Sequence, residues 1–371
     1  MAKIRKRIWR NKSGKHTCYE ITYVIEGKQY RKSGYESELD AQIDLPNVIK
    51  EINSSTKFGK LIEDYQKRHC ELICKQSTQD LYSNYVKVHL GGLKQKVAKD
   101  IKKRDIENLM LEMKTKGISN KTINSVTTFV QAVFNYGVET GYLKESPIGK
   151  VKKLPQVRPP IHFLNELQIK TFLEVAKTFT PLYYAFFATA VYTGMRRGEL
   201  IGLEWSDIDF KRAKISVNKQ YYKGIKQTTK TNKERSVDIP EVLLEILKEH
   251  KNNNTVLSKF VFHNLSGGPI NAYYMEEKQF HPLLRECNKY LDAENQIEKI
   301  RFHDLRHTYA TYLLSNSVPV KYVQEQLGHS TAKMTLDVYA SFMPSVKFEA
   351  LNLLQKLQKN DEIEHKLSTE K

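Results

Sequence analysis

The chain has 371 residues, and its 60 lysines and arginines against 42 aspartates and glutamates give a formal net charge of +18 at pH 7. This length predicts two or three domains, and a positive excess spread over a folded chain is typical of nucleic-acid-binding proteins, a basic protein without such a partner being the alternative. No uncharged apolar run reaches the roughly 18 residues that a membrane-spanning helix needs, and four scattered cysteines exclude a disulfide framework and indicate a reduced, cytoplasmic protein.

Residues 1–55 predict a small three-stranded sheet with one helix packed on it. Cys18–Ile25 is rich in β-branched and aromatic residues, and Gln29–Gly34 pairs back after a turn. A basic sheet of this kind can lie in the major groove of DNA, although a solvated edge strand that prevents aggregation has the same composition. The candidate DNA contacts are Arg5, Lys6, Arg7 and Arg10.

Residues 56–150 predict an all-helical segment, because apolar residues recur there at helical spacing. Cys70 and Cys74 lie four residues apart on one helical face, but zinc would need further ligands nearby, so we interpret them as core or surface cysteines. A linker rich in proline and lysine follows at 151–164 and is either a spacer or a contact with the phosphate backbone.

A third unit, 165–360, begins at an N-cap asparagine, Asn165, with Gln168 at the capping-box position. It is predicted to be mostly helical with one β interlude from Lys214 to Ile239. The fold class that follows is mainly α with small β-sheets (α+β), and a charged tail occupies 361–371.

An arginine and a glutamate follow an apolar helix predicted over Leu182–Tyr192. Arg196 and Glu199 lie three residues apart, so we expect them to share a helical face. A carboxylate that holds an arginine aims its guanidinium fork, which fits a phosphate. A surface ion pair of little energetic value is the alternative.

Lys230 belongs to a basic run between two strand-like segments, Lys214–Tyr221 and Ser236–Ile239. We predict a β-hairpin with this run at its tip, where the lysine could reach DNA. A solvated basic loop explains the run equally well when it is considered alone.

His303 and Arg306 also lie three residues apart, and we expect them on one helical face. With His307 the segment imitates a zinc-protease helix, but Asp304 replaces the glutamate and no third ligand is evident, so we expect no metal. A histidine beside an arginine suits an anionic phosphate, since one supplies a movable proton and the other supplies charge.

Two further groups lie near the C-terminus. Gln326–Ser330, with His329, is predicted to end one helix, and Met334–Tyr339 to begin another. Alone, a Gly-His pair is usually a helix cap, and a tyrosine is usually a core or interface residue.

Taken in chain order, these groups resemble the active-site set of the tyrosine recombinases, and the sequence resembles their phage-integrase family over its whole length. The resemblance implies an arm-site DNA-binding domain at 1–55, a core-binding domain at 56–150 and a catalytic domain at 165–360. The roles that it implies are Arg196 and Arg306 as phosphate-binding arginines, Lys230 as the hairpin lysine, His303 and His329 as active-site histidines, Tyr339 as the nucleophile and Glu199 as a supporting acid. Ala340 and Ser341 stand where the family often has a histidine, which bears only on how the tyrosine segment packs.

The function implied is that of a site-specific DNA recombinase that integrates or excises a mobile element through a covalent 3′-phosphotyrosyl intermediate. It needs neither metal nor cofactor. The expected partners are double-stranded DNA with core and arm sites, three further copies of the chain in a homotetramer, and a directionality or DNA-bending factor, all at the nucleoid of a bacterial cell. A DNA-relaxing enzyme of the type IB topoisomerase class and a non-catalytic DNA-binding regulator are the alternatives.

Overall fold

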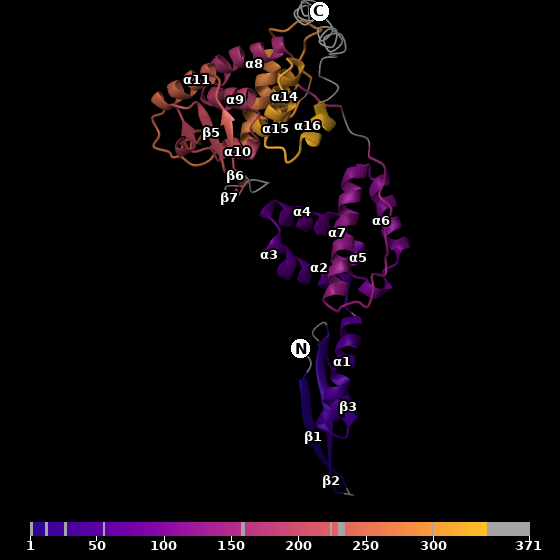
Figure 1. Cartoon of the computed structure of the whole chain (residues 1–371). Coiled ribbons are helices and arrows are strands. Elements are labelled where there is room, and N and C mark those ends of the chain that lie inside the picture. Colours follow the sequence, from indigo (N-terminus) through magenta and orange to yellow (C-terminus); the bar gives the residue numbers. More distant parts are fainter. Residues whose placement is uncertain are drawn as a thin grey trace, which may run out of the picture. The chain divides into compact units, whose positions relative to one another are not determined.

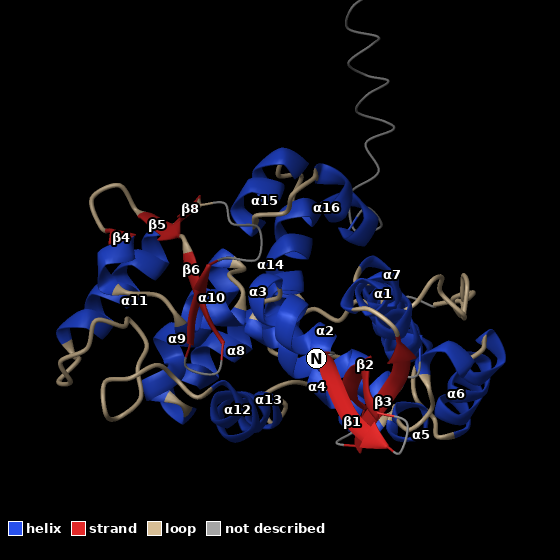
Figure 2. Cartoon of the chain, turned by 90° about the horizontal axis from the view of Figure 1, so that it is seen from below, coloured by secondary structure: helices blue, strands red, loops and turns tan. Residues whose placement is uncertain are grey.

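The computed structural model describes residues 3–11, 14–25, 28–54, 56–156, 160–222, 225–228, 234–298 and 300–339. The chain divides into two compact units, Met1–Arg158 and Pro159–Lys371 (Figure 1). Helices dominate, and the strands form three small antiparallel sheets (Figure 2). The predicted fold class, mainly α with small β-sheets, is confirmed. In the part of the chain that the structure describes, no helix is both long and apolar enough to cross a membrane.

The first unit begins with a three-stranded meander and one helix, as the sequence predicts. Its neighbouring strands pair in the order β1-β2-β3, and buried Ile21 of the central strand packs against Ala41 and Val48 of the helix. Cross-strand register places Arg5 opposite Glu20 and Arg7 opposite Cys18. The elements are β1 (Lys3–Asn11), β2 (Gly14–Ile25), β3 (Lys28–Tyr35) and α1 (Glu38–Ser54).

The rest of the first unit is helical and has its own apolar core around the long helix α7. The start of the predicted linker is fixed to this helix, because the Asn124 side chain accepts from the Leu154 amide and donates to its carbonyl, both at 2.8 Å. The elements are α2 (Phe58–Tyr65), η1 (Gln66–Cys70), α3 (Glu71–Ile73), α4 (Gln76–Val88), α5 (Gly91–Lys94), η2 (Ala98–Asp100), α6 (Lys103–Thr115) and α7 (Asn120–Glu139).

The second unit surrounds an aromatic core in which Phe186 and Phe187 of α9 contact Phe280 and Phe302. Helix α8 begins with the predicted capping box, since Asn165 and Gln168 exchange bonds of 2.9 Å between side chain and backbone. The helical elements are α8 (Glu166–Phe179), α9 (Pro181–Thr193), α10 (Arg197–Ile201), η3 (Trp205–Asp207), α11 (Glu241–Asn252), α12 (Ala272–Tyr274), η4 (Met275–Phe280), α13 (His281–Cys287), α14 (Asp304–Ser315), α15 (Val320–Leu327) and α16 (Ala332–Tyr339).

The β interlude differs from the single hairpin that the sequence predicts. Its strands are β4 (Ile208–Asp209), β5 (Lys214–Val217), β6 (Lys219–Tyr222), β7 (Ile225–Thr228) and β8 (Arg235–Asp238). β5 pairs with β8, whereas β6 pairs with β7 in a separate two-stranded ribbon. Lys230 belongs to the segment between β7 and β8 and lies outside the described residues, as does the chain after Tyr339.

Candidate active site

The centre of the site is the carboxylate of Glu199, whose side chain is only 1% exposed. Gly194, with φ of +59°, ends α9, and α10 begins at Arg197. Arg196 is therefore the N-cap of α10 with extended backbone angles, and the predicted shared helical face is wrong. Instead, Glu199 accepts from the backbone amide and from Nη1 of Arg196, both at 2.8 Å. The carboxylate holds the arginine by capping the helix.

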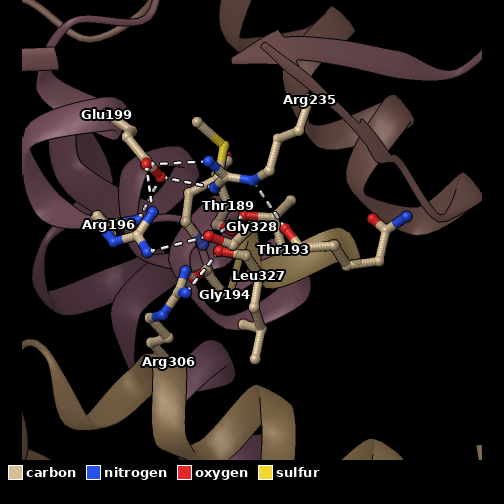
Figure 3. Close-up of polar contacts among 11 residues, drawn as sticks. Thr189, Thr193, Gly194, Arg196, Glu199, Arg235, Arg306, Leu327 and Gly328 are labelled. Carbon is tan, nitrogen blue, oxygen red and sulfur yellow. Dashed lines mark hydrogen bonds and ion pairs between the residues drawn. The ribbon is translucent and has the colours of Figure 1, made fainter. Parts of the chain in front are cut away.

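A second arginine, which the sequence analysis did not identify, binds the same carboxylate. Arg235 at the start of β8 donates from Nη1 and Nη2 to the two oxygens of Glu199, at 3.0 and 2.7 Å (Figure 3). Burial would raise the pKa of Glu199, but the hydrogen bond from Arg235 and the charges of both arginines lower it to about 2. Glu199 is thus ionised at every physiological pH.

Arg306 on α14 is only 4% exposed and reaches two helix ends. It donates to the carbonyl of Gly194, the C-cap of α9, at 2.8 Å and to the carbonyl of Leu327, the last residue of α15, at 2.5 Å (Figure 3). Burial and the neighbouring charge of Arg196 lower the pKa of Arg306 to about 9, which leaves it protonated at neutral pH. A fixed cation therefore lies beside Arg196.

His303 is the N-cap of α14 and has helical backbone angles, and its carbonyl accepts from the Arg306 amide at 3.1 Å, so the two residues lie one turn apart as predicted. Asp304 accepts from the Arg301 amide at 2.7 Å and pairs with its guanidinium, which explains the aspartate beside the histidine as a structural residue. Withdrawal from water and the charges of His307 and Arg306 lower the pKa of His303 to about 4, although part of its surface is open. The imidazole is neutral at pH 7.

His329 lies one residue beyond Gly328, and α15 ends there as the sequence predicts. The structure shows Gly328 in the left-handed conformation, with φ of +64°. Its Nδ1 is 2.9 Å from the hydroxyl of Thr335, a fully buried residue of α16. Burial and the charges of Arg306 and Arg196 lower the pKa of His329 to about 4. This contact fixes one ring nitrogen and leaves Nε2 as the remaining polar atom of a neutral imidazole.

Tyr339, the last described residue of α16, is 1% exposed and packs in a small cluster with Leu314, Val323 and Leu327. Its hydroxyl is 2.6 Å from Nδ1 of His307. Burial raises the pKa of Tyr339 to about 12, and the charge of Arg306 opposes that rise. The phenol is therefore neutral in this arrangement and must ionise if it is to attack.

The second unit thus brings together Arg196, Glu199, His303, Arg306 and His329, with Tyr339 held nearby through His307. Sequence reasoning mentioned His307 only for its spacing from His303 and did not single out Arg235. The sequence contained one signal for Arg235. It lies two residues before buried Val237 on the same strand, so both side chains lie on the inward face.

The predicted DNA contacts in the first unit have a different character. Arg5, Lys6 and Arg7 are exposed on β1, and the ammonium of Lys6 lies 5.8 Å from the ring centre of Tyr19. Arg10 lies on the same strand, and its side chain is outside the described part of the structure. Among the described residues, no group of three or more histidines, cysteines or acids could hold a metal ion.

Comparison with known proteins agrees with this geometry. The model of the phage integrase family matches residues 162–344. A tyrosine recombinase XerC-like protein of Caldanaerobacter subterraneus subsp. tengcongensis is 31% identical, covering 93% of this chain and 97% of its own length. The ICEBs1 integrase of Bacillus subtilis is 27% identical, covering 88% of this chain and 90% of its own.

Solved structures show the same fold. The Tn1549 transposon integrase in complex with a circular intermediate DNA aligns with a TM-score of 0.68 and 22% identity, over 81% of this chain and 99% of that one. A lambda integrase dimer bound to a COC′ core site aligns with a TM-score of 0.63 and 16% identity, over 92% and 95%.

The chain belongs to the phage integrase family of tyrosine recombinases. It is an enzyme of site-specific DNA recombination, of the class that moves mobile elements.

Proposed function

We propose that the chain integrates or excises a mobile element by means of a covalent 3′-phosphotyrosyl intermediate, with Tyr339 as the nucleophile. The observation that carries the proposal is the convergence of two arginines and two histidines on one site in the unit that also holds Tyr339. The roles given to Arg196, Arg306, His303, His329 and Tyr339 follow from that convergence.

The chemistry follows from charge. In the cleavage step the Tyr339 oxygen forms a bond to phosphorus while the bond to the 5′ oxygen breaks, and the transition state carries one more negative charge than the diester. Arg196 and Arg306 neutralise the non-bridging oxygens, and the neutral His303 and His329 add hydrogen bonds. The tyrosine proton passes to Nδ1 of His307, 2.6 Å from the phenol oxygen, as attack proceeds, and Lys230 supplies a proton to the 5′ oxygen.

The energy of the cleaved bond is kept in the phosphotyrosine, so a 5′ hydroxyl of the partner strand can attack it and reseal the backbone. No metal or nucleotide enters that exchange. Because the lambda integrase is described as a tetramer bound to a Holliday junction, we propose that four copies of this chain act on two paired duplexes. A directionality or DNA-bending factor would choose between integration and excision.

The organisation of the chain supports a division of labour in DNA binding. In this proposal residues 1–55 bind an arm site through the exposed cations of β1, residues 56–150 bind the core site, and 165–360 catalyse strand exchange. The cytoplasm of a bacterial cell is the compartment in which such an element would recombine.

The test removes one oxygen atom from the protein. Tyr339→Phe keeps the buried ring and removes only the hydroxyl, so folding and DNA binding should persist while an SDS-resistant protein–DNA adduct disappears. The substrate is a duplex copied from the junction of the element with its flanking DNA. Adduct formation by Tyr339→Phe would contradict the assignment, and relaxation of plasmid DNA without strand exchange would instead favour a topoisomerase.

A further inference from the structure

The carboxylate of Glu199 is saturated by hydrogen-bond donors. Each oxygen accepts one bond from Arg235 and one from Arg196, the latter from the guanidinium at one oxygen and the backbone amide at the other (Figure 3). A carboxylate offers about four lone-pair positions, so no further donor can bind it. The two-pronged bond, which gives the best carboxylate geometry, belongs to Arg235.

The three arginines at the site share one anion, Glu199, so two positive charges are left unbalanced. Arg196 touches Glu199 through one guanidinium nitrogen only, and its Nη2 lies at a long 3.5 Å from the carbonyl of Gly328. Arg306 donates to two neutral carbonyls, those of Gly194 and Leu327. Within the described part of the chain, Glu199 is the one acid paired with any of these three arginines.

We propose that Arg235 is a positioning residue that balances the charge of Glu199, so that Arg196 and Arg306 together keep two net positive charges for the scissile phosphate. This inference rests on the proposed function. The transition state of phosphodiester cleavage carries two negative charges, which two such cations match. Without Arg235, the guanidinium of Arg196 would form a two-pronged ion pair with Glu199. That pair would neutralise the charge of Arg196.

The path of Arg235 also explains the glycine before His329. A Cβ atom on Gly328 would lie 2.7 Å from Cδ of Arg235, so only glycine leaves room for the arginine to pass. The Nε of Arg235 donates to the Gln326 carbonyl at 2.9 Å. Arg235 could therefore act only as a structural link between β8 and α15. The experiment must distinguish this structural role from the balancing of the charge of Glu199.

The experiment compares cleavage of two junction duplexes that differ only at the scissile position, one with the natural phosphate and one with an uncharged methylphosphonate. We expect Arg235→Met to bind both duplexes with near wild-type affinity and to cleave the phosphate about 10²-fold more slowly. On the methylphosphonate, where one negative charge is absent, the defect should shrink to less than about 10-fold. The control is Arg212→Met, an exposed arginine in the turn after β4 that pairs with Asp209 at 3.9 Å; it should cleave both duplexes like the wild type.

A second-site variant tests charge directly. Glu199→Gln removes the anion that Arg235 compensates, so Arg235→Met/Glu199→Gln should cleave the phosphate faster than Arg235→Met alone. A double variant that is equally slow or slower, together with an undiminished defect on the methylphosphonate, would establish the anchor role and overturn the inference.

Should Arg235→Met fail to bind DNA, Arg235→Lys decides the question, because lysine keeps the charge and loses the fork. Cleavage by Arg235→Lys within about 10-fold of wild type supports charge balance, and a loss of about 10² overturns it. If the wild-type protein forms no adduct with the phosphate duplex, the proposed function itself fails. A failure confined to the Arg235 variants leaves that function intact.

Discussion

The two units use the same residue types in opposite ways. On β1, Arg5, Lys6 and Arg7 are exposed and follow one another along an edge strand. Around Glu199, arginine side chains are 22% and 11% exposed and are held by a carboxylate that is 1% exposed. Exposed cations displace counterions along any phosphate backbone, whereas buried and oriented ones can recognise one phosphate in one position.

The comparison shows that positive charge alone does not distinguish the candidate active site from an exposed basic strand. The composition predicted nucleic-acid binding, but the geometry of the site depends on which acid pairs with each arginine. Substitutions in both units can test the contrast between exposed and buried charge, beginning with the largest expected change in stability.

Removing the shared carboxylate should have the largest effect. Glu199→Ala leaves Arg196 and Arg235 without their anion in a largely dry environment, and the loss of one partner of a buried ion pair costs about 3–5 kcal/mol of unfolding free energy. Urea unfolding followed by circular dichroism measures it. Arg5→Ala, on the exposed strand, should change the same quantity by less than about 0.5 kcal/mol, and equal effects would abolish the contrast.

The next effect separates backbone strain from the close approach of a fixed arginine. Gly328→Ala combines a φ of +64° with a Cβ 2.7 Å from Arg235, whereas Gly117→Ala in the first unit has a φ of +74° and nothing within 4 Å. We expect about 1 kcal/mol of destabilisation for Gly117→Ala and about 1–3 kcal/mol more for Gly328→Ala. Thermal unfolding of the two variants compares them, and similar losses would show that Arg235 yields freely.

A smaller effect should appear on acidification. The pKa of His329 is lowered to about 4, while an unfolded histidine titrates near pH 6.5. Between those values the unfolded state binds more protons, so stability falls as the pH drops from about 7 toward 4. The expected loss at pH 5 is on the order of 1 kcal/mol, since the ring is only half-buried. His329→Gln should flatten this part of the stability profile, and an unchanged slope would place the titration elsewhere.

The smallest change in stability should come from the basic strand. Combined Arg5→Gln, Lys6→Gln and Arg7→Gln should leave the melting temperature nearly unchanged but weaken DNA binding. The slope of log affinity against log salt should fall by up to about 0.9 for each phosphate that the variant no longer neutralises. Substituting three exposed, glutamate-paired lysines is the matched control: Lys116, Lys170 and Lys289. A control that lowers the slope as much would remove any special role for β1.

Much of this fold was predictable because its signals are local. The Asn165 cap, the apolar helix α9 and the helix end at Gly328 each depend on a few neighbouring residues. The order of the active-site motifs along the chain indicated the family. The error at Arg196 arose because a spacing of three implies a shared helical face only where the helix has already begun, and α10 begins one residue later.

The remaining features depend on contacts between distant segments. The strand-like run Lys214–Tyr221 is interrupted at Asn218, and its halves pair with different strands. Arg235 meets Glu199 across 36 positions of sequence, a contact that no local pattern contains. Whether the implied role of each catalytic residue is right stays a prediction until the variants are measured.

The hydrogen bonds that hold Arg306 have a consequence for engineering. Both of its acceptors are main-chain oxygens at the ends of α9 and α15, and a side-chain substitution cannot delete a carbonyl. A designer who rewrites the surface to read a new target sequence can therefore vary many positions without unseating this cation, provided that the two helices still stop at Gly194 and Gly328.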